Sequence, residues 1–340
     1  MSISENEPLI ISASRTKDMV HRSPSLLASI LLGESPCRWG PHGPLGQVRP
    51  ERIHTLVLWT KNPQNLLQHN LLRRALFELR DCHNVQISLQ ITATGLGSSF
   101  VEPGIPVWQV VLSQVASLLL EGWIAPANVI FRYDPFLQVR TSAGRMLGNF
   151  DMELFAEICQ SFIALGIVRI TTSRADAVRY PRVLERVRML GLEWLPPDDR
   201  AAAEFCAQMS AFCLRQGASF SICCDPPLEL LLHNWGCIDA RWLNRNKGEG
   251  CQPAPEVLHN QVGKQRPACR CTYSRDIGYS PGSATCYSGG FGCLYCYAQG
   301  NAHLPNLSFL QDEIRQFDLD PLLYLSQKNL PPQLYTDARK

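Results

Sequence analysis

The cysteines are the residues of this 340-residue sequence whose type and spacing most clearly predict chemistry. Of its 14 cysteines, five fall in one short stretch, at Cys269, Cys271, Cys286, Cys293 and Cys296. The pattern Cys293-x-x-Cys296 places two thiols a short turn apart, close enough to share a metal ion or one face of an iron–sulfur cluster. Cys286 precedes this pair across a glycine-rich segment, whose backbone can wrap closely around a bulky cofactor. We therefore predict Cys286, Cys293 and Cys296 as the metal ligands, with Cys271 and Cys269 in reserve.

Spacing alone leaves three interpretations of this segment open. A structural zinc site needs four ligands and would add Cys269 or Cys271 to the other three cysteines. A redox-active Cys-x-x-Cys pair would need a thioredoxin-like context, which this sequence does not offer. A 4Fe–4S cluster held by three cysteines leaves one iron open to bind a further cofactor. The spacing favours the cluster and the zinc site over the redox pair and does not separate the first two.

The elements that must position these cysteines follow from an alternation of short apolar, β-branched segments with stretches of helical period. Predicted strands cover residues 9–14, 54–60, 85–94, 128–134, 167–173 and 218–224, and predicted helices cover 63–81, 106–121, 150–165 and 200–216. Such alternation indicates right-handed βαβ units and a parallel sheet. No glycine-rich dinucleotide fingerprint follows the first strand, which disfavours a doubly wound sheet. We predict an α/β fold, a partial (βα)6 TIM-like barrel with a C-terminal cysteine-rich cluster-binding segment.

The alternation stops after about residue 240, where a polar, loop-like stretch begins. This change predicts three parts. The partial barrel covers residues 1–240, the cysteine-rich iron–sulfur segment covers 241–303 and packs on the barrel mouth, and a C-terminal tail with one weak helix covers 304–340.

Polar side chains follow the predicted strands, where functional groups collect in parallel α/β barrels. These side chains are Arg15, Lys61, Thr94, Arg132, Asp134 and Arg174. Four cations around one cavity would attract an anionic ligand such as a carboxylate or a phosphate. The alternative is that Arg132 with Asp134, or Arg15 with Asp18, form structural ion pairs at the strand ends.

Composition and charge narrow the classes of partner. Hydrophobic residues make up 45% and charged residues 18% of the chain, which is ordinary for a folded globular protein. A net charge of +2 gives no global electrostatic reason to bind nucleic acid or an anionic membrane. The acidic, polar N-terminus does not have the pattern of a secretory signal, and the apolar stretch at 107–120 is short for a membrane span. We expect a cytoplasmic protein that is not associated with membranes, and we rank a nucleic-acid-processing enzyme third among the possible functions.

Eight motifs along nearly the whole chain resemble, in order, those of a bacterial family known as domain of unknown function 1848. They are IISASR-x-x-D at 10–18, LWTKNP at 58–63, ITATGLG at 91–97, FRYDP at 131–135, CIDA at 237–240, KQRPACRC at 264–271, SRDIG at 274–278 and GCLYCYA at 292–298. This family resembles the radical S-adenosylmethionine enzymes, and its cysteine-rich end is similar to the cluster motif of spore photoproduct lyase-like proteins.

The resemblance implies a six-unit partial βα barrel and a 4Fe–4S cluster on three cysteines, whose open iron chelates the amino and carboxylate groups of S-adenosylmethionine. It also implies that Tyr295, the aromatic residue before the last cysteine, lies beside the adenine. Two features depart from the pattern. The cluster loop of such enzymes usually follows the first strand, whereas here it is C-terminal and would have to fold back over the mouth. Six residues separate Cys286 from Cys293, a longer gap than the resemblance implies, so Cys271 is kept as the reserve ligand.

The expected function is therefore that of an iron–sulfur enzyme, in which the reduced cluster donates an electron to S-adenosylmethionine and a carbon radical forms inside the barrel. The expected binding residues for the cofactor or an anionic small-molecule substrate are Arg15, Lys61, Thr94, Arg132, Asp134 and Tyr295. An electron donor such as flavodoxin or ferredoxin would be the protein partner. The alternative is a zinc-stabilised, anion-binding barrel protein without redox chemistry. The sequence does not identify the substrate.

Overall fold

Parallel strands form the centre of the computed structural model, which describes residues 7–229, 235–248, 250–258, 268–286, 292–298 and 306–337. Six strands are those predicted from the sequence: β1 (Leu9–Ala13), β4 (Ile53–Thr60), β5 (Gln86–Thr92), β6 (Val129–Phe136), β9 (Arg169–Arg174) and β11 (Ser219–Ile222). Each pairs in parallel with the next along the chain. A short strand that was not predicted, β12 (Arg275–Asp276), pairs in parallel with β1. The α/β class and the parallel sheet are thus confirmed, with seven strands in the order β11-β9-β6-β5-β4-β1-β12.

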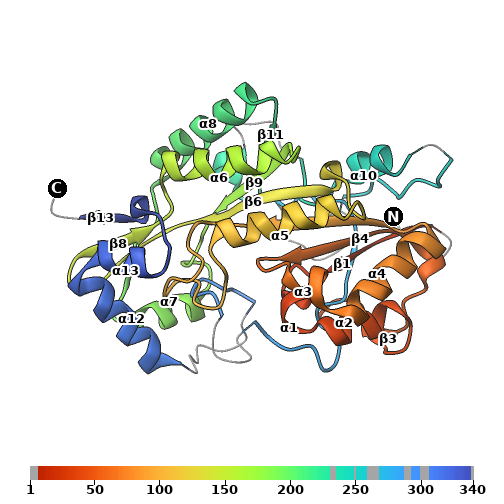
Figure 1. Ribbon diagram of the computed structural model, residues 1–340, viewed down its shortest axis with the longest axis horizontal. Coiled ribbons are helices and arrows are strands. Elements are labelled where there is room, and N and C mark those ends of the chain that lie inside the picture. The colour runs from red at the N-terminus through yellow and green to blue at the C-terminus, as the bar shows by residue number, and fades with distance from the viewer. Residues whose placement is uncertain are drawn as a thin grey trace.

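Helices connect the consecutive strands from β1 to β11, which lie side by side in chain order, whereas β12 returns to the free edge of β1. The predicted helices correspond to α4 (Asn70–His83), α5 (Trp108–Leu120), α6 (Met152–Ala164) and α8 (Asp199–Arg215). Figure 1 shows these helices in this order across the sheet. The helix predicted over 63–81 is divided, because His69 leaves the helical conformation after α3 (Gln64–Gln68) and its ring accepts the N–H of Leu72 as the cap of α4.

Side-chain alternation gives the sheet two different faces. In β5, Ile87, Leu89 and Ile91 belong to the main hydrophobic core, to which the helices also contribute. Ser88 and Gln90 lie between them in the sequence and are buried on the opposite face. The helices pack on the first face, and β5 presents polar side chains on the second.

A second, smaller apolar cluster covers this opposite face. Ile10 of β1 and Val57 of β4 pack there with Cys237 and with Ile238 and Leu243 around α10 (Ala240–Lys247). The chain after β11 therefore returns across the sheet instead of forming a separate body.

The remaining elements complete the edges of the molecule. The helices are α1 (Met19–Arg22), α2 (Pro24–Leu31), α7 (Pro181–Met189), α9 (Pro226–Glu229), α12 (Leu307–Leu319) and α13 (Pro321–Gln327), with 3₁₀ turns at Pro50–Arg52, Pro126–Asn128 and Pro332–Leu334. The strands β7 (Gln138–Arg140), β8 (Arg145–Gly148), β10 (Glu193–Trp194) and β13 (Tyr335–Asp337) form a small sheet, and β2 (Cys37–Arg38) pairs with β3 (Leu45–Gly46).

The C-terminal tail is more ordered than the sequence indicated. The prediction of one weak helix is wrong, because α12 and α13 both form and are followed by β13. Asp320 separates the two helices, and its carboxylate caps α13 by accepting the N–H of Leu323 at 3.0 Å. Phe317 and Tyr324 bury the tail against the main core, and Figure 1 shows both helices at one end of the molecule.

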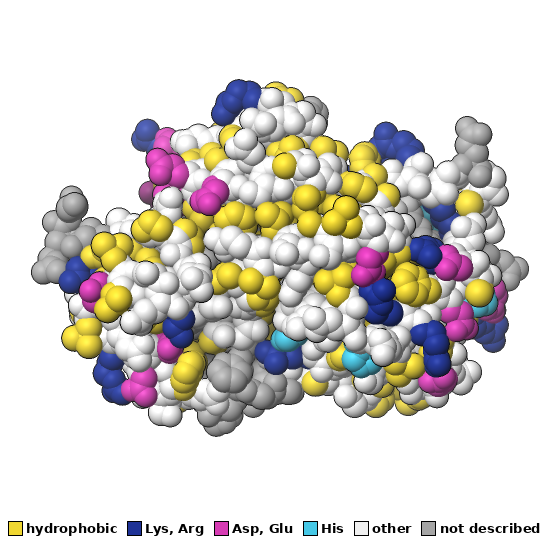
Figure 2. Space-filling model, in the orientation of Figure 1, with side chains coloured by type: hydrophobic (Ala, Val, Ile, Leu, Met, Phe, Trp, Pro, Cys, Tyr) yellow, Lys and Arg dark blue, Asp and Glu magenta, His cyan; other side chains and the backbone are white. Residues whose placement is uncertain are grey.

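Charged and apolar side chains are distributed differently over the face of the molecule that Figure 2 shows. On the face shown in Figure 2, lysine and arginine side chains are scattered and often lie beside acidic ones, while apolar side chains gather over α5 and α6. The helices in the described part of the chain do not combine the length and the apolar character needed to cross a membrane.

Candidate functional site

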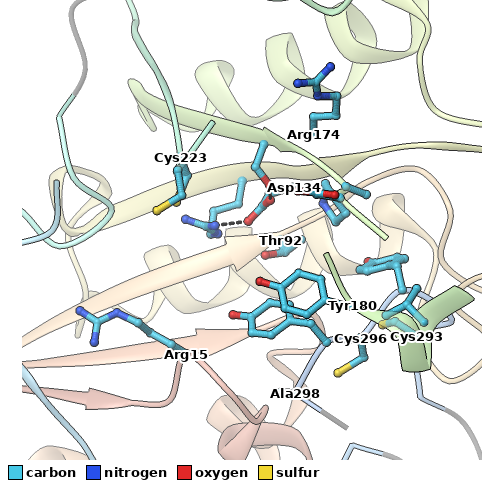
Figure 3. A pocket seen from close by; sticks show the side chains of 18 of the residues that line it. Arg15, Thr92, Asp134, Arg174, Tyr180, Cys223, Cys293, Cys296 and Ala298 are labelled. Carbon is cyan, nitrogen blue, oxygen red and sulfur yellow. Dashed lines mark hydrogen bonds and ion pairs between the residues drawn. The ribbon is translucent and has the colours of Figure 1, made fainter. Parts of the chain in front are cut away.

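One cavity of about 830 Å³ lies where the central parallel strands end, a size typical of small-molecule sites. Its walls come from the loops after β1, β4, β6, β9 and β11 and from the cysteine-rich segment. Eight cysteines line it, namely Cys223, Cys224, Cys237, Cys269, Cys271, Cys286, Cys293 and Cys296. Figure 3 shows Cys223 on one side of the cavity and Cys293 with Cys296 on the other.

The three predicted ligands Cys286, Cys293 and Cys296 share one wall. Their thiols are close enough for the charge of each to act on the others. The backbone N–H of Asp18 donates to Cys286 Sγ at 3.4 Å, so the cysteine segment lies against the loop that follows β1. Burial raises the pKa of the Cys286 thiol to about 12 and that of Cys293 well above its ordinary value. These thiols hold their protons at neutral pH, and a bound metal would have to displace them.

The turn that carries Cys293 and Cys296 is held from two sides. The N–H of Cys296 donates to the carbonyl of Cys293 at 3.0 Å, and the N–H of Leu294 donates to the carbonyl of Val101 at 2.9 Å. Arg186 of α7, which is fully buried, donates from Nε to the carbonyl of Leu294 at 3.1 Å and from Nη2 to that of Cys296. The sequence analysis missed Arg186, because one arginine in a basic, amphipathic helix gives no signal of burial.

Lys61 and Tyr295 meet at a buried carboxylate beside this turn. Lys61 Nζ lies 2.9 Å from Glu102 Oε1, and the Tyr295 hydroxyl donates to the same carboxylate. Glu102 is only 1% exposed, so both partners serve to satisfy a carboxylate inside the protein. Lys61 was predicted to bind a ligand anion, but its charge is already paired here.

Arg132 and Asp134 form the ion pair that the structural alternative described. The two side chains contact each other directly, and the Ser173 hydroxyl also donates to Asp134. Arg132 further donates from Nη1 to Cys237 Sγ at 2.9 Å and lies over the ring of Trp59, 4.9 Å from its centroid. Arg132 therefore links the strand end to a cysteine that the sequence analysis did not select.

The polar groups of Thr94 and Arg174 interact with other groups of the protein. Thr94 is buried and does not line the cavity, whereas Thr92 does, and Thr94 Oγ1 accepts the N–H of Leu96 at 3.2 Å. Arg174 lies 2.7 Å from Asp199 and 3.1 Å from Asp225. Its charge is thus matched by two carboxylates.

Arg15 differs from the other strand-end cations of the described chain. Its Nη2 donates to Ser274 Oγ at 2.7 Å, but its Nε and Nη1 are buried and have no hydrogen-bond partner. The ion pair with Asp18, which the structural alternative described, does not form, because the Asp18 carboxylate accepts the Thr60 hydroxyl at 2.8 Å and the Lys61 N–H at 2.9 Å. Two buried N–H groups of Arg15 are therefore available to a ligand.

Asp276 of β12 fixes this corner of the cavity. Its carboxylate accepts the hydroxyls of Ser12 and Ser14 at 3.0 and 2.7 Å, and the N–H groups of Arg15 and Gly278 at 2.9 Å each. A Cβ atom at Gly278 would lie 2.0 Å from Ser14 Oγ, so only glycine fits there. The motifs SRDIG and IISASR are thus two halves of one contact.

An aromatic pair lies at the rim. Tyr180 and Tyr297 stack with centroids 5.1 Å apart and rings inclined by 25°, and both line the cavity. The reserve ligands Cys269 and Cys271 lie away from this wall, in contact with other cysteines. Among the described residues, no three His, Cys, Asp or Glu side chains form a ready-made ion site.

Comparison with known proteins gives one match. The family model described as "Domain of unknown function (DUF1848)" matches residues 10–298, which includes the three predicted ligands and the large sheet except Leu9. No curated protein and no solved structure matches the chain.

Proposed function

We propose that this chain, which belongs to the DUF1848 family, is an enzyme that holds a 4Fe–4S cluster on Cys286, Cys293 and Cys296 to cleave bound S-adenosylmethionine reductively. The observation that carries the proposal is the shared wall of these three thiols in one cavity at the carboxyl ends of the parallel strands. In this proposal the sheet is a partial (βα)6 TIM-like barrel. Its six parallel strands in chain order support that architecture.

The residues around the wall fit such a cluster. Cysteine thiolates are the usual ligands of iron–sulfur clusters, and hydrogen bonds to their sulfurs adjust the cluster potential. The N–H of Asp18 already donates to Cys286 Sγ. The ammonium group of Lys61 lies close enough to favour the charged form of Cys293. Gly292 lines the cavity beside Cys293 and presents no side chain there.

When bound and reduced, the cluster supplies one electron for breaking a carbon–sulfur bond of S-adenosylmethionine. The chain would contribute binding and exclusion of water. Tyr295 would lie beside the adenine, and the stacked rings of Tyr180 and Tyr297 would close the rim against solvent. Three of the four strand-end cations are paired with carboxylates of the protein, so their charges do not require the substrate to be an anion. A one-electron donor such as flavodoxin or ferredoxin would complete the cycle.

Anaerobic reconstitution with iron and sulfide tests the proposal. The reconstituted chain should contain one cluster per chain and give a reduced electron paramagnetic resonance signal that changes when S-adenosylmethionine is added. Reduction should then release 5′-deoxyadenosine. Cys293→Ala and Cys296→Ala should each lose the cluster signal.

Cys82→Ala is the matched control, because Cys82 is exposed on α4 and does not line the cavity. It should retain the full signal. A colourless chain with zinc on Cys286, Cys293 and Cys296 would refute the proposal, and so would a cluster whose signal ignores S-adenosylmethionine.

A further inference from the structure

A second group of thiols lies across the cavity from the proposed cluster ligands. Five thiols of one packed cluster lie at the cavity wall, each close enough to interact with its neighbours around a ring: Cys223, Cys224, Cys269, Cys271 and Cys237. An isolated buried cysteine is usually a small apolar core residue. Five in mutual contact at one cavity wall, from three separate chain segments, need another explanation.

The backbone brings these segments together through specific contacts. The N–H of Cys223 donates to the carbonyl of Thr172 at 2.8 Å and extends the pairing of β11 with β9. At Gly236, a Cβ atom would lie 2.3 Å from the carbonyl oxygen of Arg270 and 2.5 Å from Cys271 Cα. Glycine at this position therefore lets the segment of Cys237 approach the backbone of Cys271 directly.

Further contacts keep the ring in place. The N–H of Thr272 donates to the carbonyl of Ile238 at 2.8 Å, and Gln90 Nε2 donates to the carbonyl of Cys237 at 2.7 Å. Cys224 has a φ of 54°, a left-handed conformation that is unfavourable for a residue with a side chain and persists only where the surroundings fix it. The ring is a built feature of the fold.

Two arginine side chains, Arg132 and Arg15, lie beside the ring. Arg132 Nη1 donates to Cys237 Sγ at 2.9 Å, while its other end contacts Asp134. Arg15 lies within electrostatic range of Cys269 and Cys271, and two of its buried N–H groups have no hydrogen-bond partner. The Arg15 guanidinium would offset part of the negative charge of an ion bound by four thiolates, and Arg132 would donate a hydrogen bond to one of those thiolates.

We infer that Cys223, Cys224, Cys237, Cys269 and Cys271 form a second metal centre, which binds one divalent ion of the zinc class through four thiolates. A metal–sulfur distance of about 2.3 Å places tetrahedral thiolates about 3.8 Å apart, so the ligands of a single ion come from side chains packed together in one cluster, as these five are. The thiolates of a 4Fe–4S cluster bind different irons and lie farther apart. The described residues contain no ready-made ion site, so the ion would draw four of these side chains together and take the place of their protons.

This inference stands apart from the proposed function, since the two groups of cysteines have no member in common. Metal analysis of the anaerobically purified chain should find one zinc per chain whether or not iron is present. X-ray absorption at the zinc edge should show a first shell of sulfur alone, at about 2.3 Å. A shell that contains nitrogen or oxygen, or a chain without zinc, would overturn the inference.

Cysteine-to-alanine variants identify the side chains that bind the zinc ion. Cys269→Ala with Cys271→Ala should lose the zinc and keep the cluster signal, whereas Cys293→Ala with Cys296→Ala should lose the signal and keep the zinc. The matched control is Cys159→Ala with Cys213→Ala, a buried pair with sulfurs 3.8 Å apart and away from the cavity, and it should keep both metals.

Zinc that disappears with Cys293 and Cys296 would place the ion at the first site and overturn the inference. If the unmodified chain holds a second iron–sulfur cluster and the variant at Cys269 and Cys271 loses it, the site does not bind a single zinc-class ion and the inference is wrong. If the variant at Cys269 and Cys271 does not fold, the zinc-edge spectrum of the unmodified chain decides the question.

Discussion

Replacement of Arg186 by leucine tests whether this buried side chain fixes the turn of the proposed cluster ligands. Arg186 is fully buried in α7 and donates to the carbonyls of Leu294 and Cys296. Arg186→Leu removes both donors and leaves a side chain of similar apolar length in their place. The two carbonyls then lie inside the protein without a partner from α7.

The expected loss follows from these two carbonyls. A buried acceptor left without a donor costs about 1–3 kcal/mol, so two of them cost roughly 2–6 kcal/mol. Leucine recovers part of the loss through apolar packing, and removal of a buried cation recovers more. We expect a decrease of about 3 kcal/mol in the free energy of unfolding. The loosened turn should also retain less iron after reconstitution.

Denaturant unfolding of the metal-free chain measures the change in the free energy of unfolding. Iron content after gel filtration measures how much iron the loosened turn retains. Arg188→Leu is the matched control, because Arg188 is exposed on the same helix and makes no ion pair in the described chain. It should change stability by no more than about 0.5 kcal/mol. Equal unfolding curves for the two variants would refute the role given to Arg186.

Two further predictions concern groups away from the metal ligands. His54 is 2% exposed, and burial, with a smaller effect of Lys247, lowers its pKa to about 4. Because the unfolded chain then binds more protons, stability should fall by about 2–3 kcal/mol as pH decreases from about 6.5 to 4. His54→Gln should flatten this dependence in denaturant titrations and exposed His42→Gln should not; parallel profiles would contradict the assignment. Asp276→Ala leaves two hydroxyls and two N–H groups without their acceptor and should cost about 2–4 kcal/mol of unfolding free energy, against about 0.5 for exposed Asp312→Ala. A smaller effect at Asp276 would mean that water replaces the carboxylate.

The large sheet could be predicted because its signal is local. Each strand is a short β-branched run between turns, and burial on both faces makes that run stand out in the sequence. The polar residues that end these strands could also be placed, since parallel strands bring their carboxyl ends to one edge. This reasoning put Arg15, Lys61 and Arg132 at one cavity, where the structure has them.

The partners of these residues could not be predicted, because they come from distant parts of the chain. Lys61 pairs with Glu102 across 41 positions, and Arg132 contacts Cys237 across 105. Thr94 was misjudged for a local reason, since its strand ends at Thr92 and its hydroxyl then caps the following turn. No periodic pattern in the sequence indicates which lysine or arginine side chain pairs with a carboxylate.

The position of the cysteine segment follows from one short strand. β12 pairs with β1 in parallel, so the chain that leaves β12 emerges at the same edge of the sheet as the chain that leaves β1. Asp276 then joins the two loops, and Cys286 reaches the N–H of Asp18 although 268 positions separate them. A cysteine motif near the C-terminus thereby occupies the space that a motif after the first strand would occupy. The order of segments along the chain thus places no restriction on where the proposed cluster ligands meet the strand ends.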